Sequence, residues 1–360
     1  MSMCVPYAVG IDVGGTKLAA ALVARDGAIT ARTFQLTPTG IDAAGLLRLL
    51  GDLVAQVTGD VAPAAIAGIG LALPAFIDYP AQRVMHCVNL PLDAAGGCDV
   101  AAELARATGL TVTIDNDANA AAIGEGTWGA ARDVRDFIMV TLGTGVGGGL
   151  VLDGKPYRGW RGLGAELGHI VVNCDDDTPC PCGGVGHLEA YVARPALTRA
   201  ARLAATGPQG GALMRACGGD ASGLDAEMLL DVADGGDPAA TAVLSRAGSV
   251  LGTALSGLVN LLNPQMIVIG GGLGMRADSL FAAADAQLRA CAPPALGDLQ
   301  LVRAQLGNDA GLLGAAALAF QRTDGAESAA DTAAGTVNAH TNTNTDTNTN
   351  TNTNTNRTDA

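Results

Sequence analysis

Two segments of this 360-residue chain share one design: an apolar strand, a glycine-rich turn and a returning apolar strand. The first covers residues 7–24, as YAVGID, VGGTK and LAAALVA, and residues 138–153 repeat it as IMVTL, GTGVGGG and LVLD. Glycine turns leave backbone N–H groups free to face an anion. Two such units about 130 residues apart predict an internal duplication, with an anion-binding turn in each copy of an α/β fold.

The other segments alternate between helical and strand patterns. Apolar residues at helical spacing predict helices at 41–59, 97–109 and 308–320, and an alanine-rich helical region at 195–262 that is broken at 207–211, 217–223 and 233–237. Strands are expected at 28–36, 65–78 and 110–114, and a strand running into a glycine turn at 263–274. This alternation indicates an α/β protein, long enough for two domains.

Composition excludes several classes of function. Hydrophobic residues make up 49% of the chain but aromatic residues only 3%, so the cores are expected to be built from small residues. The net charge of −14 gives no basic footprint for nucleic acid. The N-terminus lacks the pattern of a secretory signal, and no apolar stretch is expected to approach the ~20 residues that cross a bilayer. Eight cysteines, mostly without a pattern, suit a reducing cytoplasm.

One stretch of fewer than thirty residues, 164–191, gathers chemically active side chains. It reads GAELGHIVVNCDDDTPCPCGGVGHLEAY, and its glycines permit a tight knuckle around Cys-Pro-Cys. Thiolate and imidazole are the ligands that Zn²⁺ prefers, and four of them make a closed structural site. The spacing predicts such a site at His169, Cys180, Cys182 and His187, with Cys174 as a spare thiol; the alternative is a surface loop with incidental thiols.

Two aspartates lie where strands end. Asp12 ends the first strand, where a carboxylate can hold Mg²⁺ through water. Asp117 lies where the strand at 110–114 passes into NDANAAAIGEGTWGA, a helical pattern. A carboxylate at that junction can be aimed into a cleft as a general base, or it can cap the helix.

The motifs in their order resemble the ROK family of sugar kinases and sugar-responsive repressors. The resemblance covers roughly residues 7 to 321, although His187 and Ala75 stand where the family usually has cysteine and glycine. The motifs that carry it are DVGGTK, NDAN, GTGVGGG, GAELGH, CPCGGVGHLE and VIGGG. The segment VNLP at 88–91 is similar to a family motif. The resemblance implies a duplicated actin/hexokinase-like (ribonuclease H-like) α/β fold of two domains, with a cleft between them.

The resemblance also implies a function, ATP-dependent phosphorylation of a hexose at its 6-hydroxyl, with glucose as the expected sugar. Asp117 would be the catalytic base, and the sugar would be bound by Asn116, Asp117, Glu166, His169 and Glu189. The zinc knuckle would hold the sugar-binding residues in place. ATP and Mg²⁺ would be bound by Asp12, Gly14, Gly15, Thr16, Lys17, Gly143, Thr144, Gly145, Gly270, Gly271 and Gly272.

Several expectations complete this interpretation. The N-terminal domain is predicted at 1–122 with a returning helix at 308–321, and the C-terminal domain at 123–307. Residues 325–360 are rich in Thr and Asn and are expected to form a disordered tail. Family habit implies a homodimer. The alternatives are a kinase for N-acetylmannosamine, N-acetylglucosamine, allose or fructose, or a non-catalytic sugar-sensing regulator; a repressor would need a DNA-binding segment ahead of Asp12.

Overall fold

The computed structural model describes residues 5–87, 90–92, 99–293 and 297–324. The chain divides into two units, residues 1–320 and 321–360, and all the described strands lie in the first. The predicted tail and the first two residues of the VNLP segment lie outside the described residues.

The first sheet has five strands in the order β3-β2-β1-β4-β7. Its strands are β1 (Tyr7–Val13), β2 (Lys17–Ala24), β3 (Ile29–Leu36), β4 (Ile66–Leu73) and β7 (Val112–Asn116). β1 pairs antiparallel with β2 and parallel with β4, and β4 pairs parallel with β7. The carboxyl ends of β1, β4 and β7 therefore meet at one edge, where Asp12, Ala72 and Asp115 share a row of the sheet.

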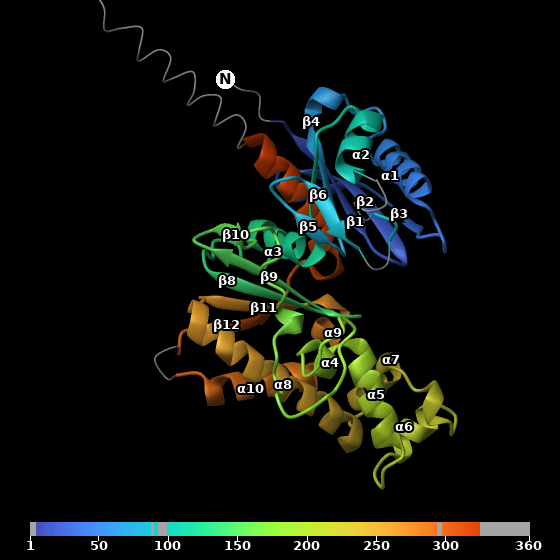
Figure 1. Ribbon diagram of the computed structural model, residues 1–360, viewed down its shortest axis with the longest axis vertical. Helices are drawn as coiled ribbons and strands as arrows, with labels where there is room; N and C mark the ends of the chain where they lie inside the picture. The colour runs from blue at the N-terminus through green and yellow to red at the C-terminus, as the bar shows by residue number, and fades with distance from the viewer. Residues whose placement is uncertain (1–4, 88–89, 93–98, 294–296, 325–360) are drawn as a thin grey trace, which may run out of the picture. The chain divides into compact units, whose positions relative to one another are not determined.

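The second sheet repeats this pattern in the order β10-β9-β8-β11-β12 (Figure 1). Its strands are β8 (Phe137–Leu142), β9 (Val146–Leu152), β10 (Lys155–Tyr157), β11 (Met266–Gly270) and β12 (Gln300–Arg303). The strand directions match position by position: β8 is antiparallel to β9 and parallel to β11, which is parallel to β12. The predicted internal duplication and the α/β fold are confirmed.

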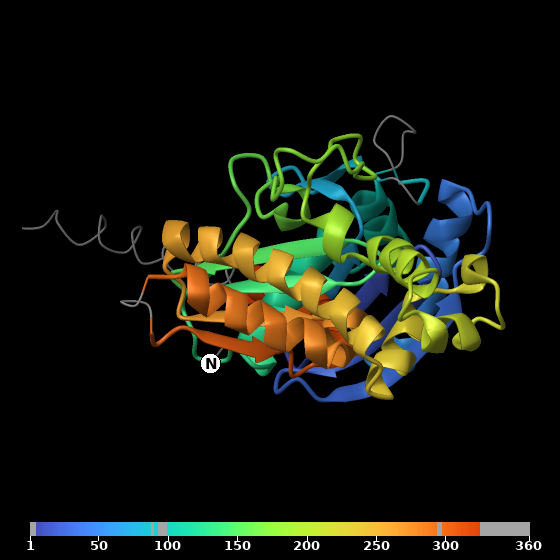
Figure 2. The ribbon, with the colours of Figure 1, turned by 90° about the horizontal axis from the view of Figure 1, so that it is seen from below.

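Helices form three layers around the two sheets. α1 (Ala43–Thr58) and α2 (Val100–Thr108) pack on one face of the first sheet (Figure 1). Its other face is covered by α3 (Asp117–Trp128) and by the helix that begins at residue 310. α3 also packs on the second sheet, whose opposite face carries α8 (Pro238–Leu262) and α10 (Asp278–Cys291) (Figure 2). The last helix therefore returns to the first sheet, as predicted.

The alanine-rich region is helical with the expected breaks. It forms α5 (Arg194–Ala205), α6 (Gly211–Ala216) and α7 (Ala226–Asp234) ahead of α8, and the short α4 (Glu189–Val192) precedes α5. Helix α8 is long and apolar enough to cross a bilayer by length and composition, so the sequence prediction on that point was wrong. Half of its most apolar window is buried, and it packs against α10 and α5, as expected of a core helix.

Small residues allow the middle layer to be thin. The core shared by α3, β4 and the last helix consists mainly of alanine, including Ala72, Ala120 and Ala315. A Cβ atom added at Gly314 would lie 1.7 Å from the backbone oxygen of Ala120, and one added at Gly70 would lie 1.7 Å from that of Ala315. The helices therefore touch the sheet and each other backbone to backbone, which confirms the expected small-residue core.

This contact predicts a large effect from one methyl group. Gly314→Ala is expected to destabilise the fold by about 3 kcal/mol, which is the upper part of the usual range for overpacking. The added methyl group would collide with the backbone of Ala120, which cannot move aside as a flexible side chain can. Gly257→Ala is the matched control, since Gly257 lies exposed in α8 with no atom within 4 Å of an added Cβ. That variant should be more stable by up to about 1 kcal/mol. Chemical denaturation of both variants measures the difference; equal stabilities would contradict the packing described.

Candidate active site

Asp117 is the first residue of α3, and its neighbour Asn116 is the N-cap. The side-chain oxygen of Asn116 accepts hydrogen bonds from the backbone N–H groups of Ala118 and Asn119, at 2.9 and 3.3 Å. Asp117 itself accepts one bond from Ala118 N, at 2.8 Å. The capping position that the sequence left open for Asp117 therefore belongs to Asn116. The amide nitrogen of Asn116 donates to the carbonyl of Ala75, at 3.4 Å, so Ala75 contributes its backbone here.

Three carboxyl groups at this junction have raised pKa values. The pKa of Asp117 is raised from its ordinary 3.8 to about 7, mainly by burial and also by the charges of Asp12 and Glu166. Burial likewise raises the pKa of Asp12 to about 6, against the opposing charge of Lys17. The pKa of Glu166 is raised by burial and by the charge of Glu189. The structure thus brings Asp12, Asp117 and Glu166 to one site from β1, α3 and the segment that follows β10.

The two glycine turns have well-defined backbones. In the first, Gly14 N donates to Lys17 O at 2.9 Å, and the Thr37 hydroxyl donates to Gly14 O at 2.8 Å. In the second, Gly143 N donates to Gly145 O at 3.0 Å. α3 lies directly against the strand after this turn, because a Cβ at Gly149 would be 2.8 Å from the backbone oxygen of Ala118. The N-terminus of α3 is therefore held beside the second hairpin.

The third glycine group lies near the second turn. A Cβ at Gly271, whose φ is +78°, would lie 2.4 Å from the backbone oxygen of Leu142, the residue before the turn. One at Gly272 would lie 3.2 Å from the guanidinium of Arg194, whose backbone N–H donates to Gly143 O at 2.9 Å. A pocket of about 550 Å³ opens beside them, lined by Thr144, Arg194, Pro195, Thr198, Arg199 and Arg202.

The predicted metal ligands do come together. Four residues each offer one ligand atom, and these four atoms all lie within 4.8 Å of one another: His169, Cys180, Cys182 and His187. Nδ1 of His169 is 3.6 Å from the sulfur of Cys180, and Nδ1 of His187 is 3.2 Å from the sulfur of Cys182. Two sulfurs and two imidazole nitrogens at these separations fit a tetrahedral Zn²⁺. Cys174 is exposed and is not part of the group.

The expected sugar-binding residues adjoin this cluster. Nε2 of His169, the ring nitrogen that does not face Cys180, lies 4.0 Å from a carboxylate oxygen of Glu166. One oxygen of Glu189 lies 3.9 Å from the sulfur of Cys180, and the other accepts a 2.8 Å hydrogen bond from Val146 N at the second glycine turn. Glu189 therefore joins the metal-ligand cluster to that turn, a contact that the sequence analysis did not predict.

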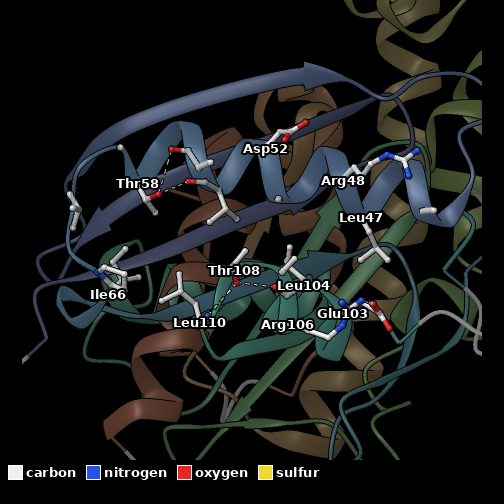
Figure 3. A pocket seen from close by; sticks show the side chains of 18 residues that line it. Leu47, Arg48, Asp52, Thr58, Ile66, Glu103, Leu104, Arg106, Thr108 and Leu110 are labelled. Atoms are coloured by element: carbon white, nitrogen blue, oxygen red, sulfur yellow. Dashed lines mark hydrogen bonds and ion pairs between the residues drawn. The ribbon is translucent and has the colours of Figure 1, made fainter.

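A larger groove of about 830 Å³ lies elsewhere, between α1 and α2 (Figure 3). Its rim carries charged side chains of both signs, among them Arg48, Asp52, Glu103 and Arg106. None of the predicted site residues is among those that line it. The groove therefore belongs to the outer helical layer of the first sheet.

Sequence reasoning missed the polar side chains that support the site. Arg194 lies just before the helical region predicted at 195–262 and was not singled out. Nor were Arg158 and Asp115, although these two form a buried ion pair. Asp115 stands two residues before Asp117, inside a strand that is otherwise apolar or uncharged. A charged residue in the middle of a buried strand was the available signal, because such residues are almost never fully buried unless paired.

Comparisons with known proteins agree with this geometry. Residues 8–322 match the model of the ROK family. The glucokinase of Halalkalibacterium halodurans is 34% identical over 331 residues, which cover 90% of this chain and 98% of the relative. The N-acetylmannosamine kinase of Escherichia fergusonii is 32% identical over 314 residues, 86% of this chain and 97% of the relative.

A solved structure is similar over the same range. The ROK family glucokinase of Streptomyces griseus, crystallised in complex with glucose and AMPPNP, matches with a TM-score of 0.74 and 31% identity. The match covers 88% of this chain and 99% of that one. With a family match from residue 8 to residue 322 and relatives above 30% identity along nearly their whole length, this chain belongs to the ROK family.

Proposed function

We propose that this protein is an ATP-dependent sugar kinase that phosphorylates glucose at the 6-hydroxyl. The observation that carries the proposal is Asp117, buried at the start of α3, whose pKa is raised to about 7 by burial and by the charges of Asp12 and Glu166. A general base is most effective when its pKa lies near the working pH. The glucokinase relatives along the whole family match support glucose as the sugar.

Phosphoryl transfer needs positioning and charge neutralisation more than covalent chemistry. Asp117 would accept the proton of the sugar hydroxyl as that oxygen attacks the terminal phosphate. Asn116, Glu166, His169 and Glu189 would hold the remaining hydroxyls. The fixed orientation of Asn116, between the N-terminus of α3 and the carbonyl of Ala75, supports such a role.

Backbone amides of the two glycine turns would cradle the phosphates, at Gly14, Gly15, Thr16 and Lys17 and at Gly143, Thr144 and Gly145. Gly270, Gly271 and Gly272 would lie along the nucleoside. The pocket that begins at Thr144 and carries three arginine side chains adjoins this path and suits an anionic ligand. Mg²⁺ held through Asp12 would neutralise charge on the nucleotide phosphates.

The Cys/His cluster would hold a structural Zn²⁺. Two sulfurs and two imidazoles complete four ligands, which leaves no position open for chemistry at the metal. His169 would bind it through Nδ1, so that Nε2 faces the sugar side. His187 stands in place of the usual cysteine, and its imidazole is also a ligand that Zn²⁺ prefers.

The two sheets support a division into an N-terminal domain at 1–122, with the returning helix at 308–321, and a C-terminal domain at 123–307. Each sheet has its own hydrophobic core on the face turned away from the other. α3, which contains residue 122, packs on both sheets, so this helix belongs to the interface between the two proposed domains. The homodimer and the cytoplasmic location stay predictions.

The raised pKa of Asp117 predicts the pH dependence. The base works only when deprotonated, so kcat/KM should fall about tenfold per pH unit below about 7 and reach a plateau above it. Glu166→Gln removes one of the charges that raise this pKa, so its acidic limb should move to lower pH. Initial rates at saturating ATP, from pH 5 to 9, measure both profiles. A limb that stays in place in Glu166→Gln would contradict the assigned coupling.

One experiment tests the proposed function. The purified protein is assayed with ATP and Mg²⁺ against glucose, N-acetylmannosamine, N-acetylglucosamine, allose and fructose, with ADP release as the readout. We expect the highest kcat/KM for glucose. A clear preference for another sugar would mean that this sugar, and not glucose, is the substrate. Binding of sugars without phosphorylation would indicate a sugar-sensing regulator instead of a kinase.

A further inference from the structure

A buried ion pair connects the edges of the two sheets. Arg158 follows β10, the edge strand of the second sheet, and Asp115 lies in β7, the edge strand of the first. Nε and a terminal nitrogen of Arg158 lie 2.7 and 2.6 Å from the same oxygen of Asp115. The two side chains are only 13% and 2% exposed, so this pair is shielded from water, unlike the surface pairs of the chain.

The second oxygen of Asp115 is bound to the helix start that carries Asp117. It accepts hydrogen bonds from the backbone N–H of Asn116, at 2.8 Å, and from the side-chain amide of Asn119, at 3.1 Å. Asn119 is itself buried, in the first turn of α3. Asp115 therefore fixes the residues on either side of Asp117 while its other oxygen holds Arg158.

Arg158 is equally well fixed on its own side. Its guanidinium lies 3.6 Å from the ring centre of Tyr79, which leaves the planar group little freedom to turn. Its carbonyl accepts a 2.8 Å hydrogen bond from Gly164 N, which closes the loop 158–164 onto Arg158. Two residues after Gly164 the chain reaches Glu166, and three residues later His169. The position of Arg158 thus sets where this loop ends and the expected sugar-binding segment begins.

We propose that Arg158 and Asp115 are positioning residues, which hold the segment of Glu166 and His169 in register with the α3 start that carries Asp117. The inference rests on the proposed function. A buried ion pair adds little net stability, because desolvation offsets most of the attraction, while it fixes geometry through its directed bonds. Two catalytic elements from different sheets need that fixed geometry, since a misplacement of about 1 Å can cost 10²-fold in rate.

The informative variant neutralises both partners. Asp115→Asn with Arg158→Met leaves no unpaired buried charge, so the double variant should melt close to the parent protein. Its kcat/KM for sugar should nevertheless fall about 10- to 100-fold, with KM for ATP changed less than about twofold. Arg158→Lys keeps the charge but not the planar fork, and should lose less activity than the double variant. Arg135→Met, which breaks the exposed pair with Asp153, is the matched control and should behave like the parent.

A second readout does not depend on activity. Amide hydrogen exchange at residues 159–169 should become faster in the double variant, while exchange in α8 stays unchanged. Unchanged exchange in that segment overturns the inference, and so does full activity in the double variant or an equal loss toward sugar and ATP. A parent protein that phosphorylates no sugar would overturn the proposed function instead, and the exchange measurement would still decide the role of the pair.

Discussion

The Asp117→Asn variant is expected to lose about 10²- to 10⁴-fold in kcat, the usual contribution of a general base. Asn keeps the size of the side chain and can still accept the bond from Ala118 N, but it cannot take a proton. Because Asn116 is the N-cap, the substitution leaves the start of α3 intact. Initial rates at saturating glucose and ATP measure the loss, and circular dichroism checks the fold.

Glu166→Gln is the matched control for this result. It removes a carboxylate from the same site, but one expected to contact the sugar in its ground state, so it should raise the sugar KM more than it lowers kcat. If Asp117→Asn instead kept a near-normal kcat while folded, the base would lie elsewhere.

The Asp117→Asn substitution, although it lowers kcat, should raise the stability of the fold at alkaline pH. The folded pKa of Asp117 is about 7 and its ordinary value is 3.8, so between these pH values only the folded chain holds the proton. That contribution to stability is present at low pH and is lost as pH rises through about 7. Asn never ionises in the buried position, so Asp117→Asn should melt higher than the parent at pH 8 and nearly equally at pH 4.

Removal of the metal is expected to have the second large effect. The purified protein should carry close to one zinc per chain, and Cys182→Ala should abolish it because one of four ligands is lost. The kcat/KM for the sugar should then fall by at least about 10²-fold. This exceeds the loss that is usual when a residue hydrogen-bonded to a metal ligand is replaced. The physical reason is that His169 is both a proposed ligand and a neighbour of Glu166, and that Glu189 lies between Cys180 and the second glycine turn.

The spare thiol provides the control. Cys174 is exposed in the same segment and outside the ligand group, so Cys174→Ala should keep both zinc and activity. Metal content is measured by mass spectrometry of the purified proteins, and sugar kinetics on the same samples. Zinc-free Cys182→Ala protein with normal sugar kinetics would show that the knuckle does not shape the site.

Features that are local in the sequence could be predicted. The two hairpins could be predicted from apolar runs around glycine turns, and the clustering of the four Cys and His side chains from their place within nineteen positions of one another. The structure bears out the predicted duplication, since the two sheets repeat the same order of strand directions. These predictions succeeded because spacing along the chain determines spacing in a turn or a knuckle.

Features that depend on distant packing could not be predicted. Asp115 and Arg158 are 43 positions apart, and only the assembled edges of two sheets bring them together. The bond between Glu189 and Val146 N is of the same kind. Asp117 was ambiguous for a different reason: a carboxylate at a strand-to-helix junction suits both a cap and a base, and only the folded structure assigns the cap to Asn116.

The two matching sheets carry different chemical groups at matching positions. In the first sheet, the row at the strand ends holds Asp12 and Asp115, and the matching row of the second sheet holds Thr141 and Gly270. The repeated backbone thus carries acidic groups in one copy and uncharged groups in the other. Two copies of the first half would double these acidic groups, and two copies of the second would lack them and the proposed base. Exchanging one half for the other is therefore expected to repeat the strand directions but to remove the division of charge that the proposed reaction uses.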